Sequence, residues 1–454
     1  MAKVLLIQPH NDRRMNKPFD NPSTPLSLIY IATAIQDFHP VKIYDRNIIF
    51  NDNDFLKVLR EYKPNIVGMG SITTEMLLDL SYVCKLIKKE MPQTTIVIGG
   101  IHATIEPDTF LNRPEVDYVI RGEGEEAFLE FCNTHDKNPK KLKELRNINK
   151  NPLRPYINLN DLKLPDYSLI DLKKYTTIFV SLSRGCSGNC SFCYSCGMWG
   201  KDGKSFIRIL STEKVKAIFK ELIEKYHVKS FSIADDNFVA FKTRAVEVCD
   251  LLSKYKVNFF CFGRADYLDD EIMGALKKAG CHTLFIGAES GSQRVLDFLN
   301  KRTKIADNIN AIRLCKKYGI VSDTSFMIGI TTETLEELNM TKQFIKKYKP
   351  DITNILIFNP LPGTAAFHYC ITNNLIKNPT TLEEWAHWTG DFLEIKHNTS
   401  KIPNEILIKT LKEMASFGFY KYNIKKFFYW VKAGEVKYAL KGIKRVLLRK
   451  YEKY

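Results

Sequence analysis

Three cysteines lie close together near the middle of the chain, in the spacing C-x-x-x-C-x-x-C. They are Cys186, Cys190 and Cys193, and the aromatic Phe192 directly precedes the last of them. Three thiolates at this spacing can bind three irons of a cubane [4Fe–4S] cluster, which leaves the fourth iron open to a small molecule. The alternative is a zinc knuckle, which needs four ligands in paired C-x-x-C spacing, so Cys196 would have to be the fourth.

Charged side chains follow three of the predicted strands that come after the cysteines. Asp235 and Asp236 follow the second strand of this series, Arg264 follows the third, and Glu289 follows the fourth. Active sites of β/α barrels form where the carboxyl ends of the strands meet, so these side chains should lie near the cysteine loop. Each also has an ordinary explanation, such as a helix N-cap for an aspartate or a salt bridge for the arginine.

The residues from 178 to 358 alternate between strand and helix patterns. The predicted strands cover 178–182, 230–234, 258–262, 283–287, 321–328 and 353–358, and the predicted helices cover 212–226, 243–255, 269–279, 292–299, 306–318 and 334–348. These six β/α units fall short of the eight of a TIM barrel, so we expect a partial barrel that is open on one side.

The first part of the chain shows a second alternating series. Strands are predicted at 4–7, 41–44, 66–69, 95–98 and 116–120, and helices at 26–35, 54–62, 75–90 and up to residue 131. This alternation favours a parallel sheet with helices on both faces, whose ligands bind beyond the carboxyl ends of the strands. The predicted α/β organisation is therefore a Rossmann-like domain over 1–135, a polar connector over 136–175, the partial barrel over 176–365 and a mainly helical region over 366–454.

The charge of the chain is strongly uneven. The 454 residues carry a net charge of +16, much of it beyond residue 420, where apolar residues in 436–451 recur at helical spacing. Such a basic amphipathic helix could contact an anionic membrane surface or an anionic substrate, or simply pack with a solvated basic face. No apolar run approaches the about 18 residues of a membrane span, and the N-terminus lacks a signal-peptide cleavage site, so we expect a cytoplasmic protein.

The cysteine motif, its aromatic residue and the charged strand ends resemble those of radical S-adenosylmethionine (SAM) enzymes. The resemblance implies that Phe192 lies beside the cofactors, that Asp235 or Asp236 accepts from the SAM ammonium, and that Arg264 pairs with the SAM carboxylate. It also implies that Glu289 binds the ribose hydroxyls. The segment 329–334 departs from the Gly/Pro turn that this family often has after its fifth strand, whereas 358–364 resembles the family's Pro-Gly-Thr turn.

The first domain resembles the cobalamin-binding domain that one large branch of these enzymes carries. The motifs concerned lie at 22–28, 67–71, 99–104 and 121–125. The resemblance implies cobalamin contacts from Ser71, Thr73, Gly99, Gly100, His102, Gly122 and Glu123. The Asp-x-His-x-x-Gly motif that supplies a histidine to cobalt in many cobalamin proteins is missing after the first strand, so we expect no histidine on cobalt. A residue of the 71–74 loop is expected below the corrin, while His102 orients backbone or the nucleotide tail.

This resemblance implies an enzyme that cleaves SAM reductively at a [4Fe–4S] cluster and transfers a methyl group from methylcobalamin to an unactivated carbon of a small-molecule or lipid-like substrate. An electron donor such as a flavodoxin or ferredoxin would be its partner, and nucleic acid is not expected. With the same cofactors, cyclisation, rearrangement or oxidation is the alternative. An RNA methylthiotransferase is disfavoured because the first domain has only Cys84 and Cys132. A non-catalytic sensor is disfavoured by the intact cysteine motif.

Overall fold

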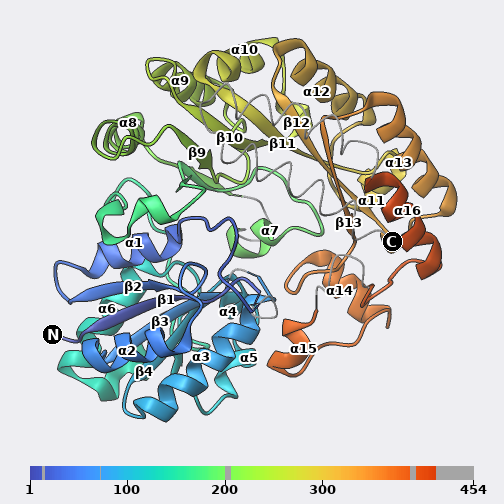
Figure 1. The fold of residues 1–454 in the computed structure, drawn as a ribbon. Coiled ribbons are helices and arrows are strands. Elements are labelled where there is room, and N and C mark those ends of the chain that lie inside the picture. The colour runs from blue at the N-terminus through green and yellow to red at the C-terminus, as the bar shows by residue number, and fades with distance from the viewer. Residues whose placement is uncertain (13–15, 72, 200–205, 389–394, 416–454) are drawn as a thin grey trace.

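The computed structural model describes residues 1–12, 16–71, 73–199, 206–388 and 395–415. Two parallel β-sheets with flanking helices form the molecule, and the helix α7 (Tyr194–Trp199) lies between them, as Figure 1 shows. The predicted α/β class, with a Rossmann-like domain followed by a partial barrel, is confirmed.

The N-terminal sheet has five parallel strands in the order β2-β1-β3-β4-β5. They are β1 (Val4–Gln8), β2 (Val41–Asp45), β3 (Ile66–Ser71), β4 (Thr95–Gly100) and β5 (Tyr118–Val119). Apolar side chains alternate between the two faces of the strands. One face packs on α2 (Asp52–Tyr62), α3 (Met76–Glu90) and α5 (Asp108–Leu111), and the other packs on α1 (Leu26–Ile35) and α6 (Glu125–Lys137). The short α4 (Ile101–Ile105) follows β4 directly.

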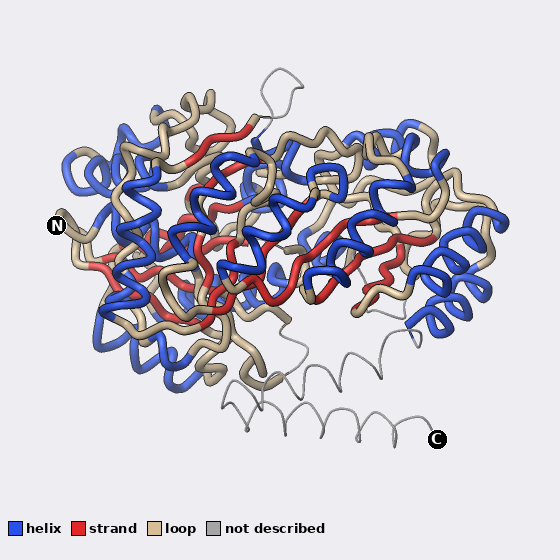
Figure 2. The backbone as a smooth tube through the Cα atoms, turned by 90° about the horizontal axis from the view of Figure 1, so that it is seen from above, coloured by secondary structure: helices blue, strands red, loops and turns tan. Residues whose placement is uncertain are grey.

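The second sheet is the partial barrel, with six parallel strands in the order β13-β12-β11-β10-β9-β6. They are β6 (Phe179–Val180), β9 (Ser230–Ile233), β10 (Asn258–Gly263), β11 (Cys281–Glu289), β12 (Val321–Ile328) and β13 (Ile352–Ile357). The helices lie along the outside of the arc, as Figures 1 and 2 show together. They are α8 (Thr212–Lys220, continued by a π-helical turn over Glu221–Lys225), α9 (Lys242–Leu252), α10 (Asp270–Ala279), α11 (Gln293–Phe298), α12 (Ile305–Tyr318) and α13 (Leu335–Tyr348).

The first barrel strand is shorter than predicted. The chain leaves the sheet after Val180 and forms a small antiparallel hairpin, which the sequence analysis missed. Its strands are β7 (Ser183–Gly185) and β8 (Ile207–Ile209), and the cysteine loop and α7 lie between them in sequence.

The connector is more ordered than its polar composition suggested. It contains short 3₁₀ helices over Pro139–Glu144, Tyr167–Leu169 and Leu172–Lys174. Leu159 and Tyr167 are buried against the barrel core. Because the connector is anchored in this way, it forms part of the interface between the two sheets.

Two C-terminal helices of the described residues return to the N-terminal domain. They are α14 (Ala365–Thr372) and α15 (Leu382–Ala386), whereas α16 (Asn404–Ala415) packs on β13 of the barrel. Trp385 and Trp388 are buried in one core with α3, so they pack rather than line a pocket. No helix in the described ranges is long and apolar enough to cross a bilayer. The predicted basic helix at 436–451, with its membrane contact, lies outside the described residues.

The loop between β12 and α13 contains a carboxyl group that should make stability depend on pH. Glu333 is 2% exposed, and burial raises its pKa from 4.5 to about 7. One of its oxygens accepts from the Gly329 amide at 2.7 Å. Below the pKa that this carboxyl has in the unfolded chain, its neutral form stabilises the protein fully. This stabilisation is lost as the pH rises through the higher pKa of the folded protein.

We therefore predict that Glu333→Gln, which keeps the acceptor and cannot ionise, gains stability relative to the parent protein as the pH rises from about 5 to about 8. The gain should be on the order of 3 kcal/mol. Melting temperatures of both proteins across this pH range measure it. A difference that does not vary with pH would contradict the assignment.

Candidate functional site

The three cysteines lie on a tight loop between β7 and α7. The amide of Gly188 donates to the Cys186 sulfur at 3.3 Å, and the Cys193 amide donates to the Cys190 carbonyl oxygen at 3.2 Å. A Cβ atom at residue 188 would lie 3.5 and 3.6 Å from the sulfurs of Cys186 and Cys190, so these two thiols flank the glycine. The same Cβ atom would come within 2.9 Å of Arg264 Nη1, so glycine at this place leaves room for the guanidinium beside the loop.

The described side chains offer no site for a single metal ion. No three histidine, cysteine, aspartate or glutamate side chains of the part of the chain that the structure describes converge closely enough for one ion. A zinc ion needs all of its ligands on one centre, whereas a cubane cluster binds each cysteine through a different iron. Three thiolates therefore suit a cluster, whereas a zinc knuckle would also need Cys196, whose side chain is outside the described residues.

Two neighbouring segments brace the cysteine loop through its backbone. The side chain of Asn300 donates to the Asn189 carbonyl oxygen at 2.6 Å. Ser191 donates its amide to Leu299 at 2.9 Å and accepts from the Ala366 amide at 2.8 Å. The loop is thus held by the turn after α11 and by the N-terminus of α14.

The two aspartates after β9 have different surroundings. One oxygen of Asp235 accepts from the amides of Leu182 and Ser183 at 2.6 and 3.0 Å. Burial raises the pKa of Asp235 to about 6, and these hydrogen bonds oppose that rise. The structure therefore places Asp235 in the support of the loop before the cysteines, which corrects its predicted position at the SAM ammonium. Asp236 instead is exposed at the cavity described below and accepts from the Ser195 hydroxyl at 2.8 Å.

Arg264 lies against the cysteine loop, as the strand-end pattern predicted. Its Nη1 is 3.6 Å from the Cys190 sulfur, and its Nη2 donates to the Lys301 carbonyl oxygen at 2.7 Å. The same guanidinium binds both oxygens of Asp266, at 3.1 and 2.9 Å. Arg264 thus connects the cysteine loop to the segment that follows α11.

Glu289 ends β11 in a left-handed conformation, with φ of 63°. Its carboxylate lies 2.8 Å from the ammonium group of Lys301, and both side chains are buried. The same ammonium group lies 6.0 Å from the centre of the Phe192 ring. A non-glycine residue in this conformation costs free energy and is most common at functional sites. Sequence reasoning missed Lys301, because its buried position depends on the turn after α11.

A cavity of about 370 Å³ lies between the strand ends of the N-terminal sheet and the start of the barrel. Five of the predicted cobalamin contacts line it: Ser71, Gly99, Gly100, Gly122 and Glu123. From the barrel side it is lined by Ser181, Ser183, Arg184, Met198, Trp199, Ala234 and Asp236. The cavity therefore lies directly beside the segment that contains the cysteines.

One part of this cavity extends from the strand ends into the space between the sheet and helices α1 and α6. Leu6, Gly68 and Phe128 line it there, and a Cβ atom on Gly68 would come within 2.7 Å of Leu6 and 3.0 Å of Phe128. Where strands β3 and β4 end, Gly100 has φ of 94°, and a Cβ atom on it would come within 2.6 Å of the Ser71 backbone. Both glycines keep the backbone close without filling the cavity.

His102 and Thr73 are not among the residues that line the cavity. The ring of His102 is buried against Trp385, its Nε2 lies 3.2 Å from the Thr109 hydroxyl, and burial lowers its pKa to about 4. Helix α4 directs this neutral side chain into the core, which corrects its predicted contact. Thr73 is exposed, and its carbonyl oxygen accepts from the Ser71 hydroxyl at 2.8 Å.

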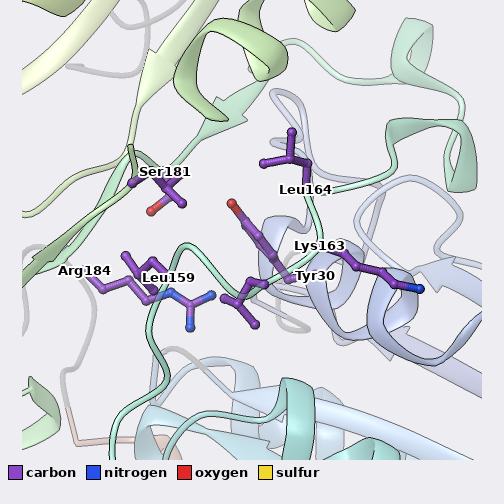
Figure 3. A pocket seen from close by; sticks show the side chains of 8 residues that line it. Tyr30, Leu159, Lys163, Leu164, Ser181 and Arg184 are labelled. Carbon is purple, nitrogen blue, oxygen red and sulfur yellow. The ribbon is translucent and has the colours of Figure 1, made fainter. Parts of the chain in front are cut away.

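A smaller pocket with room for about one water molecule adjoins the cavity. Figure 3 shows it between the connector and both domains, with Tyr30, Leu159, Lys163, Leu164, Ser181 and Arg184 around it. Sequence reasoning missed Tyr30, Arg184, Met198 and Trp199 as site residues. Only the position of Arg184, two residues before the first cysteine, could have pointed to one of them.

This arrangement defines a class of protein: a radical SAM barrel preceded by a domain of the B12-binding type. Comparison with protein families agrees, because the Radical SAM superfamily model matches residues 180–345 and the B12 binding domain model matches residues 16–131. An uncharacterised methyltransferase of Pyrococcus horikoshii is 31% identical over 430 residues, which are 90% of this chain and 91% of that protein. The chain belongs to the cobalamin-dependent radical SAM family.

Two further comparisons concern a curated protein and a solved structure. An anaerobic magnesium-protoporphyrin IX monomethyl ester cyclase of Rubrivivax gelatinosus is 29% identical over 67% of this chain and 58% of that protein. The structure of the radical SAM methyltransferase TsrM from Kitasatospora setae, with cobalamin and a [4Fe–4S] cluster bound, matches with a TM-score of 0.71 at 15% identity. That match covers 92% of this chain and 91% of TsrM. The matches to the radical SAM and B12-binding family models give this chain a [4Fe–4S] cluster, SAM and cobalamin as its cofactors.

We predict that Asp235→Ala removes the support of the cysteine loop. The buried amides of Leu182 and Ser183 would lose their acceptor, which should lower the free energy of unfolding by about 3 kcal/mol. The anaerobically reconstituted variant should also retain less iron per chain than the parent. Asp250→Ala is the control, because that carboxylate is 56% exposed and its loss should change stability by less than about 0.5 kcal/mol. Parental iron content and stability in Asp235→Ala would rule out the supporting role.

Proposed function

We propose that this protein is a C-methyltransferase that places a methyl group on an unactivated carbon of a small molecule. One observation supports this most strongly: the cavity of the B12-binding domain shares its wall with the segment that contains the cysteines. Met198 and Trp199 line the cavity only five and six residues after Cys193. A substrate between the cavity and the cysteine loop would therefore be within reach of both cofactors.

The residues at the barrel strand ends fit SAM by their chemistry. SAM presents a carboxylate, an ammonium group and ribose hydroxyls. Lys301 and Arg264 are cations that suit the carboxylate, while Glu289 and Asp236 are acceptors that suit the ammonium group or the hydroxyls. The three cysteines would hold the cluster.

The N-terminal domain fits cobalamin by its shape. The broad part of the cavity at the strand ends suits the flat corrin, and the part between the sheet and helices α1 and α6 suits the nucleotide tail. None of the described residues that line the cavity is a histidine. In our proposal Ser71 lies below the corrin, and cobalt receives no histidine from the protein.

When bound, these cofactors supply one-electron cleavage of SAM, hydrogen abstraction and methyl donation. The residues of the chain orient them and keep out water. The buried Lys301–Glu289 pair and the bracing of the cysteine loop keep the site rigid, so that no reorganisation is needed during reaction. A flavodoxin or ferredoxin in the cytoplasm is the electron donor in this proposal.

Ring formation with the same cofactors is the second candidate, and the similarity to the magnesium-protoporphyrin cyclase favours it. The two candidates differ in what happens to SAM. Methyl transfer consumes a second SAM to remethylate cobalamin and releases S-adenosylhomocysteine. Ring formation releases 5′-deoxyadenosine without a stoichiometric amount of S-adenosylhomocysteine.

We predict that the protein, reconstituted anaerobically with iron, sulfide and hydroxocobalamin and reduced with titanium citrate, forms methylcobalamin and S-adenosylhomocysteine from SAM. It should also form 5′-deoxyadenosine. Absorption spectroscopy and mass spectrometry measure these products, and Cys190→Ala is the control that should abolish 5′-deoxyadenosine formation. Deoxyadenosine without S-adenosylhomocysteine or methylcobalamin would favour the second candidate, and the absence of all three products would refute both.

A further inference from the structure

The cysteine loop and α7 lie in sequence between the two strands of the hairpin β7–β8. Arg184 and Arg208 are directly opposite each other in this antiparallel pair. Like charges in such positions repel and destabilise the pairing. Each arginine is largely buried, with 15% and 11% of its side chain exposed, so solvent does little to screen the repulsion. The hairpin therefore needs a negative charge from elsewhere.

Glu123 of the N-terminal domain supplies this charge. Its carboxylate accepts from Arg184 at 2.6 Å and from Arg208 at 2.8 and 3.1 Å, and its side chain is 5% exposed. It also accepts from the Ile157 amide of the connector at 2.8 Å. Burial alone would raise the pKa of Glu123, but the hydrogen bonds and charges of the two arginines lower it below its usual value.

Glu125 completes the network by forming an ion pair with Arg184. Two carboxylates and two guanidinium groups then balance each other across the interface between the domains. Removing one member of a buried ion-pair network is costly, because the remaining charged partners stay buried and unpaired. The network therefore favours one relative position of the hairpin and the N-terminal domain.

The same network forms part of the cavity wall. Glu123, Glu125 and Arg184 all line the cavity. Arg208 does not line it, but its guanidinium lies 5.4 Å from the ring of Trp199, which does. The wall of the cobalamin cavity and the base of the cysteine segment are thus fixed by one set of contacts. Glu123 makes these contacts and also lines the cavity, so its contact with cobalamin stays a prediction.

We propose that Glu123 couples cobalamin binding to assembly of the cluster-bearing segment, so that each cofactor binds more tightly when the other is present. A bound cluster further stabilises the cysteine loop and helix α7, and the hairpin that carries them presents Arg184 and Trp199 at the cavity wall. By linkage, cobalamin then strengthens cluster retention by the same factor. This inference takes cobalamin as the ligand of the cavity and so rests on the proposed function.

The test is an anaerobic titration of the full-length protein with hydroxocobalamin, followed by absorption. The dissociation constant is measured for cluster-loaded and for iron-free protein, and the ratio of the two values reports the coupling. We expect a ratio of at least about 5 for the parent protein and of about 1 for Glu123→Gln. Glutamine preserves the shape of the side chain but removes the charge that both arginines need.

Glu115→Gln is the matched control. Glu115 is a buried glutamate of the same domain that accepts from Arg113 at 3.1 Å, and it does not line the cavity. This variant should keep the parental ratio. Arg208→Gln tests the same contact from the barrel side in case Glu123→Gln fails to fold, and it should also reduce the ratio to about 1. The double variant should lower the ratio no further, because both changes break one interaction.

A parental ratio in Glu123→Gln and Arg208→Gln, or a ratio of about 1 in the parent protein, would overturn the coupling while leaving the proposed function intact. Loss of coupling in Glu115→Gln as well would also overturn it, because the effect would not be specific to the interface. If hydroxocobalamin does not bind to the parent protein at all, the proposed function fails and the coupling fails with it.

Discussion

The structure depends most on the contact between a carboxylate of the N-terminal domain, Glu123, and two arginines of the hairpin β7–β8. Arg184 and Arg208 are opposed across a short hairpin, and Glu123 binds both through three hydrogen bonds of 2.6 to 3.1 Å, while Glu125 supplies the second negative charge at Arg184. Because the cysteine loop begins two residues after Arg184, the position of the cysteines depends on this contact between domains. The barrel and the N-terminal domain therefore build the site jointly, and neither contains all of it.

The rest of the cysteine loop is held by contacts from several strand ends. Asp235 binds the backbone that precedes the loop, Arg264 lies against Cys190, and Asn300 and Ala366 bind the backbone inside it. Asp235, Arg264 and Asn300 belong to three different β/α units and Ala366 belongs to α14, so these contacts form only when the barrel is folded. A site that must exclude water and align cofactors gains from rigidity of this kind.

Most elements of the fold could be predicted from the sequence, because the apolar residues on their buried faces recur at the spacing of a helix or a strand. Helix α1 and strand β12 begin and end where predicted, since turn residues and apolar patterns mark both of their ends. The hairpin β7–β8 could not be predicted, because two strands of three residues, separated by the cysteine segment, leave no periodic signal. This hairpin nevertheless positions the segment that contains the cysteines.

The site was predictable in its chemistry but less so in its contacts. The cysteine motif and the charged strand ends identify the region, yet Asp235 and His102 prove to be buried supports, and Lys301 was missed. Sequence places a residue at a strand end but does not say which way its side chain points. Asp235 and Asp236 show this, because Asp235 binds the buried backbone before the cysteine loop whereas Asp236 faces the cavity.

The central claim is that cobalamin and the iron–sulfur cluster share one site between the two sheets. A crystal structure of the protein reconstituted anaerobically with iron, sulfide and hydroxocobalamin tests it most directly. Our account predicts a corrin between Ser71 and Asp236, with its nucleotide tail beside Gly68 and the cluster bound to Cys186, Cys190 and Cys193. Cobalamin bound away from this cavity, or a metal centre that does not use these three cysteines, would contradict it.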